Sequence, residues 1–200
     1  MNFCEYVVTE AGFGADLGAE KFINIKCRKA GIQPVLSVLV VTTQALKMHG
    51  GVPVKDIKQP NREGLQKGFE NMNKHIQNLQ SFGQQVLVSF NKYDFDTEEE
   101  IELLGNHCKE MNVGFAVNDA FAKGGEGAVE LAQKVVEMTS GKSDKTLHFT
   151  YKDTDTIQRK VEKIAMKIYG ARRVIFSEKA LKMIPKILEM GGAEYPVCIA

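Results

Sequence analysis

The chain has 200 residues, of which 44% are hydrophobic and 26% charged, a composition typical of a soluble globular protein. Its length is enough for one sizeable α/β domain or for parts of two. The 26 basic and 25 acidic residues leave a net charge of +1, which argues against a protein that binds nucleic acid by neutralising many phosphates.

No segment has the length of a membrane span. The longest apolar run, residues 35–41, is interrupted by Ser37, whereas a bilayer needs about 20 apolar residues. Four cysteines are present, none of them in a CxxC pair: Cys4, Cys27, Cys108 and Cys198. We therefore expect free thiols, no metal site and a cytoplasmic protein without membrane or nucleic-acid partners.

Short β-branched runs alternate with longer amphipathic segments along the chain. The runs predict strands at residues 5–9, 35–43, 85–90, 114–117, 147–151, 174–176 and 197–200. The amphipathic segments predict helices at residues 61–82, 97–111, 127–138, 156–169 and 177–190. This alternation is typical of an α/β fold with a mixed, mostly parallel sheet. Because both ends of the chain lie close to or inside predicted strands, we expect a segment of a longer protein.

The first segment that could carry chemistry is GFGADLG, which follows a predicted strand and precedes a likely helical stretch. Its glycines, Gly12, Gly14 and Gly18, fit neither the dinucleotide pattern GxGxxG nor the phosphate-binding pattern GxxxxGK[ST]. Backbone N–H groups at such a turn can face an anion at the start of the helix. The alternative is a tight turn with no ligand.

The second segment is AKGGEGA, which lies between a predicted strand and the helix at residues 127–138. Lys123 stands beside Gly124 and Gly125, which would let a ligand approach the backbone closely. In α/β sheets ligands gather at the carboxyl ends of the strands, where this loop is expected. The preceding Phe121 is either a packing residue or a platform on which a ring stacks.

The third segment is NKYDFDTEEE, a loop after the preceding strand. Tyr93 and Phe121 follow two successive strands at equivalent positions, so they could face each other across a slot for a flat ligand. The alternative is a small hydrophobic cluster beneath the loops. Glu98, Glu99 and Glu100 follow the predicted N-cap Thr97, a pattern more typical of a helix start than of a metal site.

The segments TEAGFGADLGAEKF, VTTQALKMHGGV, FNKYDFDTEEEIELL and FAKGGEGAVELA, in this order, are very similar to stretches of formate–tetrahydrofolate ligases. The resemblance extends over essentially the whole chain. It implies a partial P-loop-NTPase-like domain followed by a smaller α/β domain. Residues 1–55 would belong to the part that binds ATP and formyl phosphate, and residues 56–200 to a folate-binding domain with a truncated end.

The resemblance also implies the reaction. Formate, tetrahydrofolate and ATP, with Mg²⁺, would give formyltetrahydrofolate, ADP and phosphate through formyl phosphate. No tightly bound cofactor is expected, a monovalent cation is possible, and the parent enzyme would be a homotetramer. Because the sequence has no GxxxxGK[ST], we expect the 200-residue chain to lack the phosphate cradle and to be inactive alone.

Site residues follow from the same resemblance. Phe13, with Gly12 and Gly14, resembles the lining of a formyl phosphate pocket, whereas Tyr93 and Phe121 resemble aromatic residues that stack on a flat substrate ring, either pterin or adenine. The implied substrate-binding residues are Tyr93, Asp94, Val117, Phe121, Lys123, Gly124 and Gly125. The family commonly has Phe-Pro where this chain has Tyr93-Asp94, and Trp where it has Phe121. The loop therefore lacks the proline that would stiffen it, and the smaller ring at 121 is expected to weaken the slot.

Two alternatives to an enzyme segment remain. The chain would be a stand-alone module that binds folate or a nucleotide without catalysis, or an expressed segment with no independent role. An upstream phosphate-binding loop in the same reading frame would favour the enzyme.

Overall fold

The structure is a computed structural model that describes residues 3–141 and 146–199. The chain divides into two compact units, unit 1 from Met1–Gln33 with His148–Ala200 and unit 2 from Pro34–Leu147. Each unit is described by itself. The predicted division into residues 1–55 and 56–200 concerns the substrates that each part binds, and it stays a prediction.

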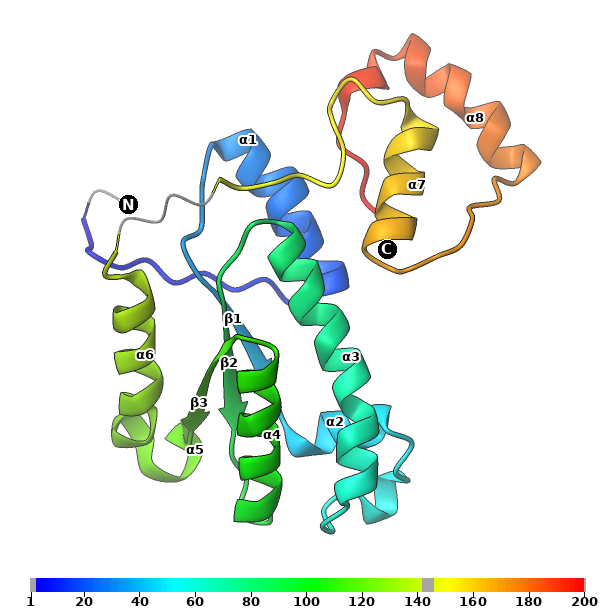
Figure 1. The fold of residues 1–200 in the computed structure, drawn as a ribbon. Coiled ribbons are helices and arrows are strands. Elements are labelled where there is room, and N and C mark those ends of the chain that lie inside the picture. Colours follow the sequence, from blue (N-terminus) through cyan, green and yellow to red (C-terminus); the bar gives the residue numbers. More distant parts are fainter. Residues whose placement is uncertain (1–2, 142–145, 200) are drawn as a thin grey trace. The chain divides into compact units, whose positions relative to one another are not determined.

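Unit 2 is built on a parallel sheet of three strands, in the order β1 (Ser37–Val41), β2 (Val86–Asn91) and β3 (Gly114–Asn118) (Figure 1). The predicted α/β class is thereby confirmed, and the sheet of the described residues is wholly parallel rather than mixed. β2 lies between the other two strands, and its residues from Val86 to Phe90 are buried. A central strand covered on both faces explains this nearly continuous apolar run.

In unit 2, α3 (Arg62–Ser81), α4 (Glu98–Glu110) and α6 (Val129–Thr139) begin and end close to the predicted positions. The short helices α2 (Thr43–His49) and α5 (Ala120–Lys123) were not predicted, and 3-10 turns lie at Val54–Asp56 and Gly124–Ala128. The hydroxyl of Thr97 accepts a hydrogen bond from the Glu100 amide, which confirms the predicted N-cap of α4. The predicted strand at residues 35–43 stops at Val41 because the Thr42 hydroxyl caps α2.

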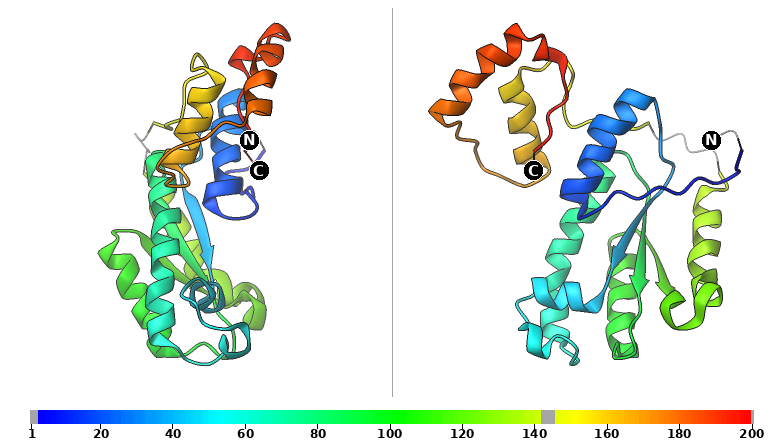
Figure 2. Two further views of the ribbon diagram at one scale, coloured as in Figure 1. Left: turned by 90° about the vertical axis from the view of Figure 1, so that its right-hand side faces the viewer. Right: turned by 180° about the vertical axis from the view of Figure 1, so that it is seen from behind.

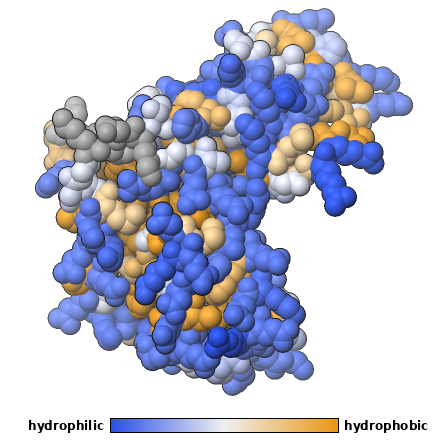
Figure 3. All heavy atoms as spheres, viewed as in Figure 1, coloured by the Kyte–Doolittle hydropathy of each residue, from blue (hydrophilic) through white to orange (hydrophobic). Residues whose placement is uncertain are grey.

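Helices cover the two faces of the sheet in unit 2. A Cβ on Gly105 of α4 would lie 3.3 Å from the Phe115 ring, and one on Gly114 would lie 2.9 Å from the Met138 sulfur of α6. Because successive strand residues point to opposite faces, α4 and α6 lie on opposite sides of the sheet (Figure 2). Polar residues cover most of the visible surface, with apolar residues showing between them (Figure 3).

Unit 1 contains a helical stretch from Ala15 to Ala30, which starts with two π-helical segments, Ala15–Ala19 and Phe22–Cys27, and ends as α1 (Arg28–Ala30). It also contains α7 (Ile157–Lys167), α8 (Glu178–Glu189) and a 3-10 turn at Gly192–Glu194. The hydroxyl of Ser177 caps α8, as predicted. The helix expected after the GFGADLG turn is therefore present.

The strands predicted in unit 1 are wrong. Residues 5–9, 148–151, 174–176 and 197–199 form no strand, nor does Leu147 at the border of unit 2, and Ala200 lies outside the described residues. Local β-propensity is not enough without a neighbouring strand to complete the ladder. The backbone N–H of Thr150 instead donates to the Asn24 side chain at 2.9 Å, so Tyr151 is buried by an irregular segment.

Candidate functional site

Three loops leave the carboxyl edge of the sheet in unit 2. Since the strands are parallel and in register, with Val41 opposite Phe90 and Asn91 opposite Asn118, all three strands end at the same edge. The side chain of Asn118 donates a 3.0 Å hydrogen bond to that of Asn91, which ties the ends of β2 and β3 together. The predicted positions 93–94 and 121–125 therefore follow neighbouring strand ends, where α/β sheets bind ligands.

In the loop after β2, Tyr93 stacks on Phe95, with ring centroids 5.3 Å apart and planes 9° apart. The ammonium of Lys58 lies 5.7 Å from the centre of the Phe95 ring. Tyr93 is nevertheless 38% exposed, and Asp94 is also exposed. The Tyr93–Phe95 pair corresponds to the small hydrophobic cluster that was the alternative hypothesis, while Tyr93 stays accessible to a flat ligand.

The loop after β3 begins with α5, and its Phe121 is 92% exposed. Within the described residues, the ring stacking of this loop region involves Tyr93 and Phe95 and does not include Phe121. Val117, at the end of β3, is half-buried and pairs with Phe90. A slot between Tyr93 and Phe121 therefore stays a prediction, as does contact of Val117 with a substrate.

The glycines of the same loop differ in the space around them. A Cβ on Gly124 or Gly125 would meet no atom within 4 Å, and Gly124 has φ +59°, so the backbone here is open to a close approach. A Cβ on Gly127 would instead lie 2.3 Å from the Asp119 carbonyl oxygen. Lys123 forms an ion pair of 2.8 Å with the Asp119 carboxylate, so its charge is partly compensated before any anion binds.

Two buried polar pairs beneath the Tyr93 loop were missed by the sequence analysis. The Thr43 hydroxyl donates to the Asp96 carboxylate, and the Lys47 ammonium lies 2.7 Å from the Glu100 carboxylate. The side chain of Glu100 also accepts from the Asn61 amide at 2.9 Å. All four side chains are buried. A possible signal was the shared four-residue spacing, Thr43 to Lys47 and Asp96 to Glu100, but Glu100 was read only as part of a helix start.

The surface charges of the loop are compensated locally. Lys92 forms a 2.9 Å ion pair with Glu98, and this hydrogen-bonded carboxylate raises the pKa of the Lys92 ammonium above its ordinary value. Arg62 pairs with Glu99 at 2.8 Å, with both side chains exposed. These contacts fasten the start of α4 from outside, where solvent screens them strongly.

In unit 1, the GFGADLG segment forms a tight turn at the start of the helical stretch. The Gly14 carbonyl accepts from the amides of Leu17 and Gly18 at 3.0 and 2.9 Å. A Cβ on Gly18 would lie 1.7 Å from the Gly12 carbonyl oxygen, so the turn requires glycine there. Phe13 has φ +64° and is 91% exposed.

A non-glycine residue at positive φ stores backbone strain, and such strain often marks a functional site. The turn itself is thus confirmed. Binding of an anion or of formyl phosphate at Phe13, Gly12 and Gly14 stays a prediction.

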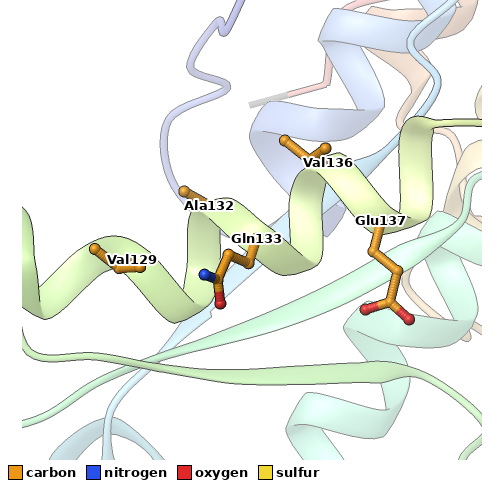
Figure 4. Close-up of a pocket in the computed structure, with 5 residues that line it drawn as sticks. All are labelled: Val129, Ala132, Gln133, Val136 and Glu137. Carbon is orange, nitrogen blue, oxygen red and sulfur yellow. The ribbon is translucent and has the colours of Figure 1, made fainter.

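A shallow hollow runs along α6 and contains none of the predicted site residues. Its lining residues are Val129, Ala132, Gln133, Val136 and Glu137 (Figure 4). Across residues 3–141 and 146–199, we find no group of three or more His, Cys, Asp or Glu side chains arranged to hold a metal ion. No helix in the described part of the chain is long and apolar enough to cross a membrane.

The sequence model of the family described as "Formate--tetrahydrofolate ligase" matches residues 1–200. Proteins of that name from Bacteroides fragilis, Bacteroides thetaiotaomicron and Porphyromonas gingivalis are 58%, 55% and 54% identical to this chain over 200 residues. In each case the match covers 100% of this chain and 36% of the relative, so the chain spans about a third of their length.

Proposed function

The chain belongs to the formate–tetrahydrofolate ligase family, and on this premise we propose that it provides the ring-binding part of an ATP-dependent enzyme that joins formate to tetrahydrofolate. The observation that carries the proposal is the shared sheet edge at which the Tyr93 and Phe121 loops emerge. A parallel sheet offers its ligand-binding crevice there, and both loops present partly or fully exposed aromatic rings.

In this proposal the pterin ring of tetrahydrofolate packs on Tyr93, with Phe121 closing over its other face. An aromatic pair adds about 0.5–1.5 kcal/mol beyond the burial of area. Gly124 and Gly125 let the substrate approach the backbone, where a side chain would stand in the way. Lys123, released from Asp119 or shared with it, offers a positive charge to an anionic group of the substrate.

In this proposal the GFGADLG turn serves the phosphorylation of formate. Phe13 lines the pocket in which ATP phosphorylates formate, and Gly12 and Gly14 let the backbone turn beside the formyl phosphate. ATP with Mg²⁺ binds as a substrate, and its phosphate cradle comes from a part of the full-length enzyme outside these 200 residues, which contain no GxxxxGK[ST]. We expect the 200-residue chain alone to be inactive and the complete enzyme to be a homotetramer that responds to monovalent cations.

The stand-alone binding module is the second candidate function. The open glycines and the exposed Phe121 are compatible with a protein that binds folate without catalysis. ADP formation separates the two, because a binding module forms none in any context.

The test uses a full-length chimera, in which this sequence replaces the matching 36% of the Bacteroides fragilis relative. We expect formate- and tetrahydrofolate-dependent ADP formation by the chimera and none by the 200-residue chain. Tyr93→Ala and Phe121→Ala should each raise the KM for tetrahydrofolate about tenfold and leave those for formate and ATP within about twofold, since loss of a stacked ring costs roughly 1.4 kcal/mol.

Tyr93→Phe keeps the ring and serves as the matched control, with KM values close to those of the unmodified chimera. A larger rise in the KM for ATP than for tetrahydrofolate would assign the rings to adenine. Unchanged kinetics in both alanine variants would reject the ring-binding proposal.

A further inference from the structure

The loop that carries Tyr93 is fastened from below by a matched pair of buried contacts. On α2, Thr43 and Lys47 are four residues apart, and they meet Asp96 and Glu100, which are also four residues apart. Both contacts join residues 53 positions apart in the sequence. One turn of α2 therefore contacts the Tyr93 loop through Thr43 and the first turn of α4 through Lys47.

We propose that Asp96 is a positioning residue which, held by Thr43, fixes Tyr93 in the orientation that receives the substrate ring. The proposal rests on the ring-binding function proposed above. It adds residues that touch no substrate to those that do, and it assigns α2 the role of a platform beneath the ring site.

The contacts of Asp96 lead directly to Tyr93. One carboxylate oxygen accepts from the Thr43 hydroxyl, and the other accepts from the backbone amide of Tyr93 at 2.7 Å. The Asp96 amide in turn donates to the Tyr93 carbonyl at 3.0 Å. Asp96 is 8% exposed, so water competes little for these hydrogen bonds. Both backbone polar groups of Tyr93 are thus held by one buried residue.

The second contact, between Lys47 and Glu100, fixes the position of α2 relative to α4. The Lys47 ammonium, which is fully buried, bonds both oxygens of Glu100 and the Gln59 carbonyl at 2.7–3.0 Å. On its other side α2 packs tightly on α3, because a Cβ on Gly68 would lie 2.0 Å from the Leu46 carbonyl oxygen. α2 therefore cannot slide without breaking a buried ion pair or opening a backbone contact.

A fixed ring binds better than a mobile one, because less conformational entropy is lost when the substrate arrives. Residue 94 is aspartate, so no proline ring stiffens this loop. The Thr43–Asp96–Tyr93 chain of hydrogen bonds provides the stiffness instead. The cost of losing it should therefore appear in substrate binding rather than in the chemical step.

The variants are chosen to separate positioning from folding. Thr43→Val keeps the shape of the side chain and removes the donor, Thr43→Ser restores the donor, and Asp96→Asn keeps the size while replacing one acceptor. Glu99→Gln is the matched control, since Glu99 forms an exposed ion pair with Arg62 in the same turn of α4. Amide exchange of Val88, in the buried strand β2, reports whether each variant still folds.

Two measurements are made on each variant. In the 200-residue chain, Thr43→Val and Asp96→Asn should speed amide exchange of Tyr93 about tenfold or more, with Val88 unchanged, and Thr43→Ser should restore the slow rate. In the chimera, the same two variants should raise the KM for tetrahydrofolate about tenfold, leave kcat and the KM for formate within about twofold, and be rescued by Thr43→Ser. Glu99→Gln should change neither.

Unchanged exchange at Tyr93 in both variants would overturn the inference, because the loop would not depend on these contacts. So would faster exchange with an unchanged KM for tetrahydrofolate. If Tyr93→Ala itself leaves this KM unchanged, the ring-binding function has failed and the positioning role fails with it. That failure is recognised from Tyr93→Ala, independently of the Thr43 and Asp96 variants.

Discussion

The loops that follow β2 and β3 leave the same edge of the sheet, yet they are held in different ways. The Tyr93 loop rests on Asp96 and, through it, on Thr43 in α2. The Phe121 loop is closed at its base, where the Asp119 amide donates to the Gly127 carbonyl at 3.0 Å and the Asp119 carboxylate pairs with Lys123 at 2.8 Å, and Phe121 itself is 92% exposed. For the proposed ring site, this difference predicts one fixed side, the Tyr93 loop, and one side that closes on the substrate, the Phe121 loop.

We expect the largest loss of stability beneath the Tyr93 loop, when the buried Glu100 carboxylate loses Lys47 as its partner. Lys47→Met leaves the Glu100 carboxylate buried without its cation, which we expect to lower the free energy of unfolding by about 3–5 kcal/mol in urea titrations followed by circular dichroism. Lys67→Met is the control, because Lys67 forms an exposed ion pair with Glu63 and should change stability little.

A double variant tests whether the lost stability comes from the unpaired charge of Glu100. Lys47→Met combined with Glu100→Leu removes both charges, so it should recover part of the stability lost in the single variant. If Lys47→Met proves no less stable than Lys67→Met, the buried pair does not hold α2 and α4 together.

In the Phe121 loop, substitution should destabilise the protein at Gly127, at the base of the loop, and be tolerated at Gly125. Gly127→Ala forces a Cβ to within 2.3 Å of the Asp119 carbonyl oxygen and should cost about 1–3 kcal/mol of unfolding free energy. Gly125→Ala meets no atom within 4 Å and should stay within about 0.5 kcal/mol of the unmodified chain. Equal stabilities of the two variants in urea would contradict this view of the loop.

The smallest expected effect is the difference in unfolding free energy between Tyr93→Ala and Phe121→Ala in the absence of ligand. Tyr93→Ala removes the stacking on Phe95 and should cost about 1 kcal/mol of unfolding free energy. Phe121→Ala removes a ring with little burial and should stay within about 0.5 kcal/mol. A larger loss for Phe121→Ala would mean that the ring packs against the protein in solution.

Sequence reasoning recovered the elements whose determinants are local. The 3.6-residue periodicity of α3, the Thr97 cap of α4 and the buried run of β2 each depend on neighbouring residues, and each was confirmed. The strand predicted at residues 5–9 failed because a strand needs a partner that local sequence does not supply, and Val8 there is 92% exposed.

The buried contacts of the site were beyond the reach of the same reasoning. The bond from Thr43 to Asp96 joins residues 53 positions apart, and it forms only because β1 and β2 are adjacent and parallel. Locally, Thr43 was part of an expected strand and Asp96 part of an expected loop. Tertiary placement, rather than propensity, turned both into supports of Tyr93.

The most direct test of the fixed side is the mobility of the two rings in the free 200-residue chain, measured by aromatic ¹³C relaxation. We expect a high order parameter for the Tyr93 ring and a low one for the Phe121 ring, with Thr43→Val lowering only the value for Tyr93. Equal mobility of the two rings, or a Tyr93 ring that is insensitive to Thr43→Val, would contradict the account.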